Sequence, residues 1–137
     1  MSRMLERFRG DEGKDLRIES FCAQTIVRGD VQLAEAFAEA AEMIEVDAGV
    51  TLIDQNGEDD DIYFIFTGSL SININGRRLG TRGRGDHVGE MAAIEPTQRR
   101  SATVIAEDGS VLAKLTAQQF STIAKVYPDI YRQIARS

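Results

Sequence analysis

The chain has 137 residues, with 22 acidic against 16 basic side chains and a formal net charge of −6. This length fits one domain of ordinary size, and the acidic balance argues against a nucleic-acid partner, which needs clustered lysine and arginine. A single cysteine, Cys22, excludes an intramolecular disulfide, and with the single histidine, His87, it excludes the usual His-rich or Cys-rich metal sites. The sequence has no signal-peptide core and no run long enough to span a bilayer, so we expect a cytoplasmic protein with no membrane partner and no metal.

Residues 1–40 form a helical lead-in in our interpretation. Met4, Leu5 and Phe8 recur at helical spacing. Gly29 and Asp30 then predict a stop followed by an N-cap. Apolar residues after this cap recur on one face of an amphipathic helix: Val31, Leu33, Ala34, Phe37, Ala38 and Ala41. This stripe predicts a helix that packs on the core of the domain.

Residues 41–116 change to a period of two, and turn signals follow at short intervals. Seven strands are predicted, over Met43 to Val46, Val50 to Asp54, Ile62 to Thr67, Leu70 to Asn75, Arg77 to Arg82, Arg100 to Ala106 and Ser110 to Leu115. Short strands at such regular spacing predict a sandwich or barrel.

Two charged groups lie within the strand region. The carboxylates of Glu58, Asp59, Asp60 and Asp61 point to alternating sides of an extended segment and cannot all close on one ion, so we interpret this run as a solvated turn. Four arginines follow, at positions 77, 78, 82 and 84. We expect the first two on an exposed hairpin, whereas Arg82 or Arg84 can either belong to the same hairpin or reach the base of a ligand.

The stretch from Gly89 to Val104, GEMAAIEPTQRRSATV, places one carboxylate and one guanidinium among small apolar residues. Gly89 can bring the backbone close to a ligand. The run from Glu90 through Met91 and Ala92 to Ile94 predicts a short helix before Pro96. Because its first N–H groups have no intrahelical partner, they favour an anion, most often a phosphate.

Arg100 shares a strand face with Ala102, Val104 and Ala106, which should be the core face. A buried unpaired charge is costly, so Arg100 needs a partner. One candidate is Glu90 in an internal ion pair. The other is a ligand phosphate, in which case Glu90 accepts a hydrogen bond from a sugar hydroxyl. Ribose cyclic monophosphate carries both groups.

The segments Gly89-Glu90-Met91-Ala92-Ala93-Ile94 and Arg100-Ser101-Ala102-Thr103-Val104 resemble the phosphate-binding cassette, here residues 89–104, of cyclic-nucleotide-binding domains. The resemblance implies an α+β fold: an antiparallel β-roll or jelly-roll of about eight short strands, with N-terminal helices, a short cassette helix and two C-terminal helices. It also implies a 3′,5′-cyclic nucleotide as the regulatory ligand, with Glu90 on the ribose 2′-hydroxyl and Arg100 on the cyclic phosphate. By the same resemblance, Ser101 and the backbone at Met91 and Ala92 assist in binding the nucleotide.

Residues 117–137 predict two helices. Thr116 is the expected N-cap of the first, which buries Phe120, Ile123 and Ala124, and Pro128 begins the second. In the family this last helix usually continues for several turns and closes over the base, so the lid is truncated by comparison. Tyr131 is the best remaining candidate to stack on a base, and a core aromatic is the equal alternative.

Three segments, MLERFRGDEGKDLRIESF, IYFIFTGSLSININGRR and HVGEMAAIEPTQRRSATV, resemble the sensor half of bacterial Pycsar TIR effectors. The resemblance implies an anti-phage protein that senses cyclic UMP and carries a C-terminal TIR effector domain that destroys NAD. The chain itself is then a sensor and not an enzyme, because Glu90 lacks a second carboxylate, histidine pair or activated serine. Two alternatives stay open: a homodimer, and a cyclic AMP or cyclic GMP sensor domain of a transcription regulator, channel or other signalling protein.

Overall fold

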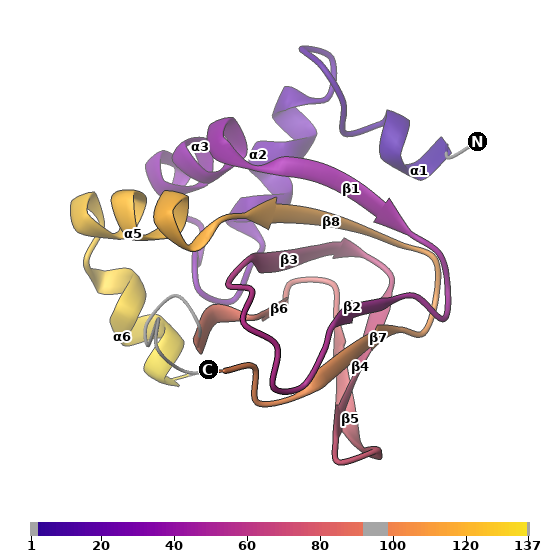
Figure 1. The fold of residues 1–137 in the computed structure, drawn as a ribbon. Helices are drawn as coiled ribbons and strands as arrows, with labels where there is room; N and C mark the ends of the chain where they lie inside the picture. The colour runs from indigo at the N-terminus through magenta and orange to yellow at the C-terminus, as the bar shows by residue number, and fades with distance from the viewer. Residues whose placement is uncertain (1–2, 92–98, 137) are drawn as a thin grey trace.

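The computed structural model describes residues 3–91 and 99–136, in which helices flank two four-stranded antiparallel sheets (Figure 1). The first helices are α1 (Arg3–Glu6), α2 (Lys14–Cys22) and α3 (Val31–Ala40). The strands are β1 (Glu42–Val46), β2 (Thr51–Ile53), β3 (Ile62–Thr67), β4 (Ser69–Ile74), β5 (Arg77–Gly83), β6 (His87–Val88), β7 (Thr103–Ala106) and β8 (Ser110–Leu115). The chain closes with α5 (Ala117–Val126) and α6 (Asp129–Arg136). None of the helices in these ranges is long and apolar enough to cross a lipid bilayer.

The two sheets have the strand orders β1-β8-β3-β6 and β2-β7-β4-β5. The eight strands confirm the expected antiparallel α+β fold. Strand β6 was not predicted, because its two residues are too short to display a period. The strand predicted from Arg100 begins only at Thr103, because the Arg100 backbone pairs with a loop: its N–H donates to Gly57 O over 2.9 Å, and its carbonyl accepts from Asn56 N over 2.7 Å.

Strand β3 is buried on both of its faces, which explains its nearly continuous apolar sequence. Ile62, Phe64 and Phe66 pack against the helices, while Tyr63 and Ile65 pack in the layer between the two sheets. The alternation follows from the period of two in a strand. The sheet that contains β3 therefore lies between the helices and the second sheet.

Several phenylalanine side chains lie at the contact between the helices and the first sheet. The ring centroid of Phe21 on α2 lies 5.3 Å from that of Phe64 on β3, and Phe37 on α3 is 5.9 Å from Phe120 on α5. Each such pair adds about 0.5–1.5 kcal/mol beyond area burial. The helices at the two ends of the chain are thus joined through one aromatic cluster.

Both predicted helix caps are confirmed. Asp30 accepts a hydrogen bond from Leu33 N over 3.2 Å, and Thr116 with Gln119 forms a reciprocal capping box at the start of α5. The predicted stripe on α3 is wrong at its first residue, since Val31 is 54% exposed. Val31 lies in the first helical turn, directly after the cap, where the chain still enters from solvent.

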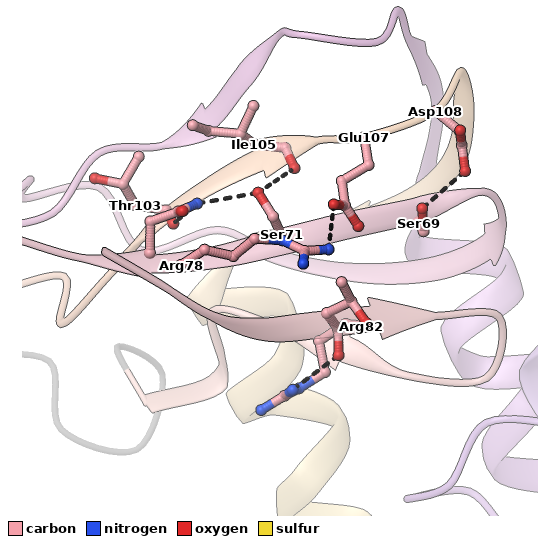
Figure 2. A network of polar contacts seen from close by, with 10 residues as sticks. Ser69, Ser71, Arg78, Arg82, Thr103, Ile105, Glu107 and Asp108 are labelled. Atoms are coloured by element: carbon pink, nitrogen blue, oxygen red, sulfur yellow. Dashed lines mark hydrogen bonds and ion pairs between the residues drawn. The ribbon is translucent and has the colours of Figure 1, made fainter. Parts of the chain in front are cut away.

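The β4–β5 hairpin contains a bulge that sends two of its arginines to opposite faces. Ile72 pairs with Gly80, but Asn73 pairs with Arg78, so Leu79 is an extra residue on β5. Arg78 consequently lies on the outer face, where it pairs with Glu107, and Figure 2 shows Arg82 on the other side of the hairpin. The outer face is tied to β7 by Ser71, whose hydroxyl donates to Ile105 O over 3.3 Å.

Candidate functional site

A hollow of about 160 Å³ lies over the inner side of the second sheet, beside β6. Four strands contribute apolar lining through Ile53, Ile72, Val88 and Val104, and Met91 and Ala102 add to it from outside the strands. The polar lining comes from Arg82, His87, Glu90, Arg99, Arg100 and Ser101. One ordered water needs only about 10–15 Å³ on this measure, so the space is sufficient for part of a small organic ligand.

Arg100 is the most buried charged group in the described part of the hollow, with 5% of the residue exposed. Its Nη1 donates to Gly89 O over 3.0 Å, and its Nη2 donates to Asp61 O over 2.6 Å and to Asp59 Oδ2 over 2.8 Å. The Nε atom is buried and has no hydrogen-bond partner among the described residues. The neighbouring Arg99, by contrast, is exposed.

Arg100 does not form the internal ion pair with Glu90 that the sequence suggested as one alternative. Its partner is instead Asp59, from a segment 41 residues earlier in the chain. The acidic run is exposed at Glu58, Asp59 and Asp60, as the solvated interpretation expects, and Asp61 is half-buried. The Asp59 carboxylate, 46% exposed, also has a role that was not predicted, because it balances the charge of a guanidinium that is 4% exposed.

Residues 56–59, in the segment before β3, bond to Arg99 and Arg100 of the cassette. Glu58 Oε1 lies 2.9 Å from Arg99 Nη2, next to the Asp59–Arg100 pair, and the backbone of Asn56 and Gly57 bonds that of Arg100. Two adjacent carboxylates thus meet two adjacent arginines. The sequence does contain this complementary pair of charges, Glu58-Asp59 and Arg99-Arg100. It does not show that the two segments are in contact, because they are far apart in the chain.

The position of the Arg100 guanidinium requires a glycine at position 89. Its φ is +91°, a conformation that side chains rarely adopt, and a Cβ at this position would lie 2.5 Å from Asp61 O and 2.8 Å from Arg100 Nη1. Both distances are too short for any side chain. Glycine therefore allows three backbone and side-chain groups to converge on the guanidinium.

Glu90 turns toward His87 and not toward Arg100. Its Oε1 lies 3.7 Å from His87 Nε2, and its side chain is 24% exposed against 5% for the histidine. The His87 ring packs on Phe64, with 6.0 Å between the ring centroids. Burial lowers the pKa of His87, and the nearby Glu90 carboxylate opposes that shift only in part. Burial therefore favours the neutral imidazole of His87, beside a partly exposed carboxylate.

The other predicted site residues divide into those that line the hollow and those that do not. Gly89, Met91 and Ser101 line it, and so does Arg82. Glu90 and Met91 are helical, whereas Ala92 and the rest of the predicted cassette helix lie outside the described residues. Arg99 and His87 also line the hollow, although neither was proposed as a site residue from the sequence.

Two predicted base contacts lie elsewhere within the described structure. Arg84 is exposed and is not among the described residues that line the hollow. Tyr131 on α6 is 38% exposed and packs edge-on against Phe120, with 6.4 Å between the ring centroids. Of the three candidates, Arg82 alone borders the described hollow. Within residues 3–91 and 99–136, no group of three or more His, Cys, Asp or Glu side chains is placed to hold a metal ion.

The chain is similar to known proteins over nearly its whole length. It is 50% identical over 133 residues to the Pycsar effector protein BcPycTIR of Burkholderia cepacia, and 40% identical over 134 residues to the Pycsar effector protein PaPycTIR of Pseudomonas aeruginosa. These alignments cover 97% and 98% of the chain but 44% of each relative, so the chain spans less than half the length of these curated relatives.

A solved structure and a family model agree with the fold described above. The structure of cAMP-bound PfPKA-R (141-441) superposes with a TM-score of 0.80 at 17% identity, over 98% of this chain and 46% of that one. At this identity the likeness shows the fold alone. The family model described as cyclic nucleotide-binding domain matches residues 43–127, which include the strands, the hollow and α5. The chain therefore belongs to the cyclic nucleotide-binding domain family.

Proposed function

We propose that the chain is the sensor domain of a Pycsar TIR effector and that its ligand is a 3′,5′-cyclic nucleotide, specifically cyclic UMP. Family membership supports the class of ligand, and the names of the two bacterial relatives support the class of effector. The choice of uracil comes from the resemblance of the sequence to that group of effectors.

The observation that carries the proposal is the guanidinium of Arg100. It is held at the side of the hollow by two backbone carbonyls and one carboxylate, and its Nε–H is a buried donor without a partner among the described residues. A buried unpaired donor is costly, and a phosphate oxygen satisfies it with a charge-assisted hydrogen bond. In the proposed complex the cyclic phosphate takes this place, near Gly89 and Ser101.

The remaining polar groups of the hollow fit the rest of the ligand. Glu90 is proposed to accept a hydrogen bond from the ribose 2′-hydroxyl, because its carboxylate is partly exposed and is not used by Arg100. Met91 and Ala92 are proposed to contribute backbone N–H groups to the phosphate, as expected at a helix start. Arg82 is the described candidate for the base, since the bulge at Leu79 turns it toward the hollow.

The chain binds this ligand without converting it, and in the full-length protein a TIR domain carries out the chemistry. In the division we propose, residues 41–116 hold the nucleotide and residues 117–137 pass the change to the effector. The relatives support this arrangement because the region similar to this chain is less than half of each. Ligand binding shifts the equilibrium between two arrangements of the helices only if these arrangements differ in affinity for the ligand.

Calorimetric titration with the cyclic mononucleotides of uracil, cytosine, adenine and guanine tests the proposal. We expect the tightest binding with cyclic UMP, and unchanged nucleotide recovered after long incubation. Preference for cyclic AMP without a response to cyclic UMP contradicts the assignment of the signal. Absence of binding by all four contradicts the sensor function itself. In the full-length protein, cyclic UMP is expected to trigger loss of NAD.

A further inference from the structure

We propose that His87 is a positioning residue for Glu90: its Nε2–H directs the Glu90 carboxylate so that one oxygen stays available to the ribose 2′-hydroxyl. The inference rests on the proposed function, because it assigns how one of the proposed ligand contacts is held in place. It concerns a residue on β6, the edge strand of the first sheet, next to the cassette.

The histidine is fixed by its surroundings, and the glutamate is not. The His87 side chain is 5% exposed and packs on the ring of Phe64, whereas the Glu90 side chain, which also lines the hollow, is 24% exposed. A glutamate has three side-chain torsions, and ordering it on ligand binding costs conformational entropy. A rigid donor beside the carboxylate lowers this cost.

The two ring nitrogens of His87 have different environments. Nδ1 is buried and has no hydrogen-bond partner among the described residues, while Nε2 lies 3.7 Å from Glu90 Oε1. A neutral imidazole carries its proton on one nitrogen only. Because a buried N–H without an acceptor is costly, the proton belongs on Nε2, where the carboxylate is the acceptor. Closing the gap by roughly 0.7 Å produces an ordinary hydrogen bond.

This geometry gives Glu90 a divided role. One carboxylate oxygen faces the histidine, and the second remains for the sugar hydroxyl. Arg100 does not compete for either, because its guanidinium is already bonded to Asp59 and to two backbone carbonyls. His87 therefore acts on the ligand through Glu90 alone, which predicts that its loss affects recognition of the 2′-hydroxyl and leaves recognition of the phosphate unchanged.

The test compares affinity for cyclic UMP with affinity for 2′-deoxy cyclic UMP on the same protein sample. Effects of a variant on folding or on phosphate binding change both affinities alike, so they cancel in the ratio of the affinity for cyclic UMP to that for 2′-deoxy cyclic UMP. His87→Phe keeps an aromatic ring but removes the donor, and His87→Gln supplies an amide N–H at the place of Nε2. We expect the ratio to fall about three- to tenfold in His87→Phe, the range of one net hydrogen bond, and to stay within about twofold of the unmutated protein in His87→Gln. Glu90→Gln, measured in parallel, sets the ratio for a site without the carboxylate.

An unchanged ratio in His87→Phe overturns the inference, and so does a loss in His87→Gln as large as that in His87→Phe. If the unmutated protein binds none of the cyclic nucleotides, the proposed function fails as well, so the two failures are distinguishable. Nitrogen NMR of the unmutated protein with cyclic UMP provides a test without variants. The Nε2–H tautomer of His87 is expected, and the Nδ1–H tautomer overturns the inference.

Discussion

Arg100 Nη2 lies 2.8 Å from Asp59 Oδ2, so the guanidinium that we assign to the ligand phosphate already has an anionic partner from the segment before β3. The two residues are 41 positions apart in the chain. The carboxylate is half exposed and the guanidinium is buried, so the charge on Arg100 is balanced by a group that can still move into water. A phosphate bound by Arg100 would therefore experience the negative charge of Asp59 as well.

Removing the Asp59 charge is expected to tighten ligand binding. Asp59→Asn keeps a side-chain oxygen for Arg100 but removes the negative charge that repels the phosphate. Because the carboxylate is nearly half exposed, the effect should stay below about 1 kcal/mol, which corresponds to an increase in affinity of up to roughly fivefold. Calorimetry with cyclic UMP measures it, and Asp60→Asn, an exposed neighbour with the same change in charge, is the control. Weaker binding in Asp59→Asn than in Asp60→Asn contradicts this role.

Gly89→Ala is expected to destabilise the domain and to impair binding. Its Cβ would overlap Asp61 O and Arg100 Nη1, in addition to the strain of a φ of +91°. Gly76→Ala is a matched control, because Gly76 has a φ of +79° and no atom within 4 Å of the added carbon. Thermal unfolding should show a loss of about 1 kcal/mol for the control and a clearly larger loss for Gly89→Ala. Equal losses, with binding retained in both, would show that the close approach at Gly89 is unimportant.

The β-roll was predictable because its signals are local. The apolar run Ile62–Thr67 and the cap at Thr116 are local features of the sequence, and the structure has a strand and a capped helix at these places. Burial of Arg100 agrees with the alternation that it shares with Val104 and Ala106. Its pairing with Asp59 could not be predicted, because the sequence does not specify which of four neighbouring carboxylates a distant loop presents. The sequence also left open whether Arg82 lies on the same face of the hairpin as Arg78. Their placement on opposite faces depends on a bulge at Leu79, and no distinctive residue marks this bulge.

Stability at mildly acidic pH is expected to depend on His87. Burial lowers its pKa below the ordinary value of 6.5, so the unfolded chain takes up a proton at a higher pH than the folded domain does. The contribution of the neutral histidine is complete above pH 6.5 and is lost as the pH falls through the lower folded-state pKa. Urea unfolding of the unmutated protein and of His87→Phe between pH 7.5 and pH 5 measures it. The stability advantage of the unmutated protein should shrink as pH falls; an advantage that grows would show that the folded domain favours the charged imidazole.

Titration with cyclic UMP of the unmutated chain, Arg100→Ala and Arg99→Ala tests directly whether Arg100 binds the ligand phosphate. The two arginines are adjacent, but Arg100 is buried in the hollow and Arg99 is exposed in an ion pair with Glu58. A charged hydrogen bond contributes about 1.5–3 kcal/mol, so Arg100→Ala should lower affinity by roughly tenfold to more than a hundredfold. Arg99→Ala should change it little, and circular dichroism should show both variants folded. Tight binding of cyclic UMP by folded Arg100→Ala, or loss of binding in Arg99→Ala alone, would show that Arg100 does not bind the phosphate.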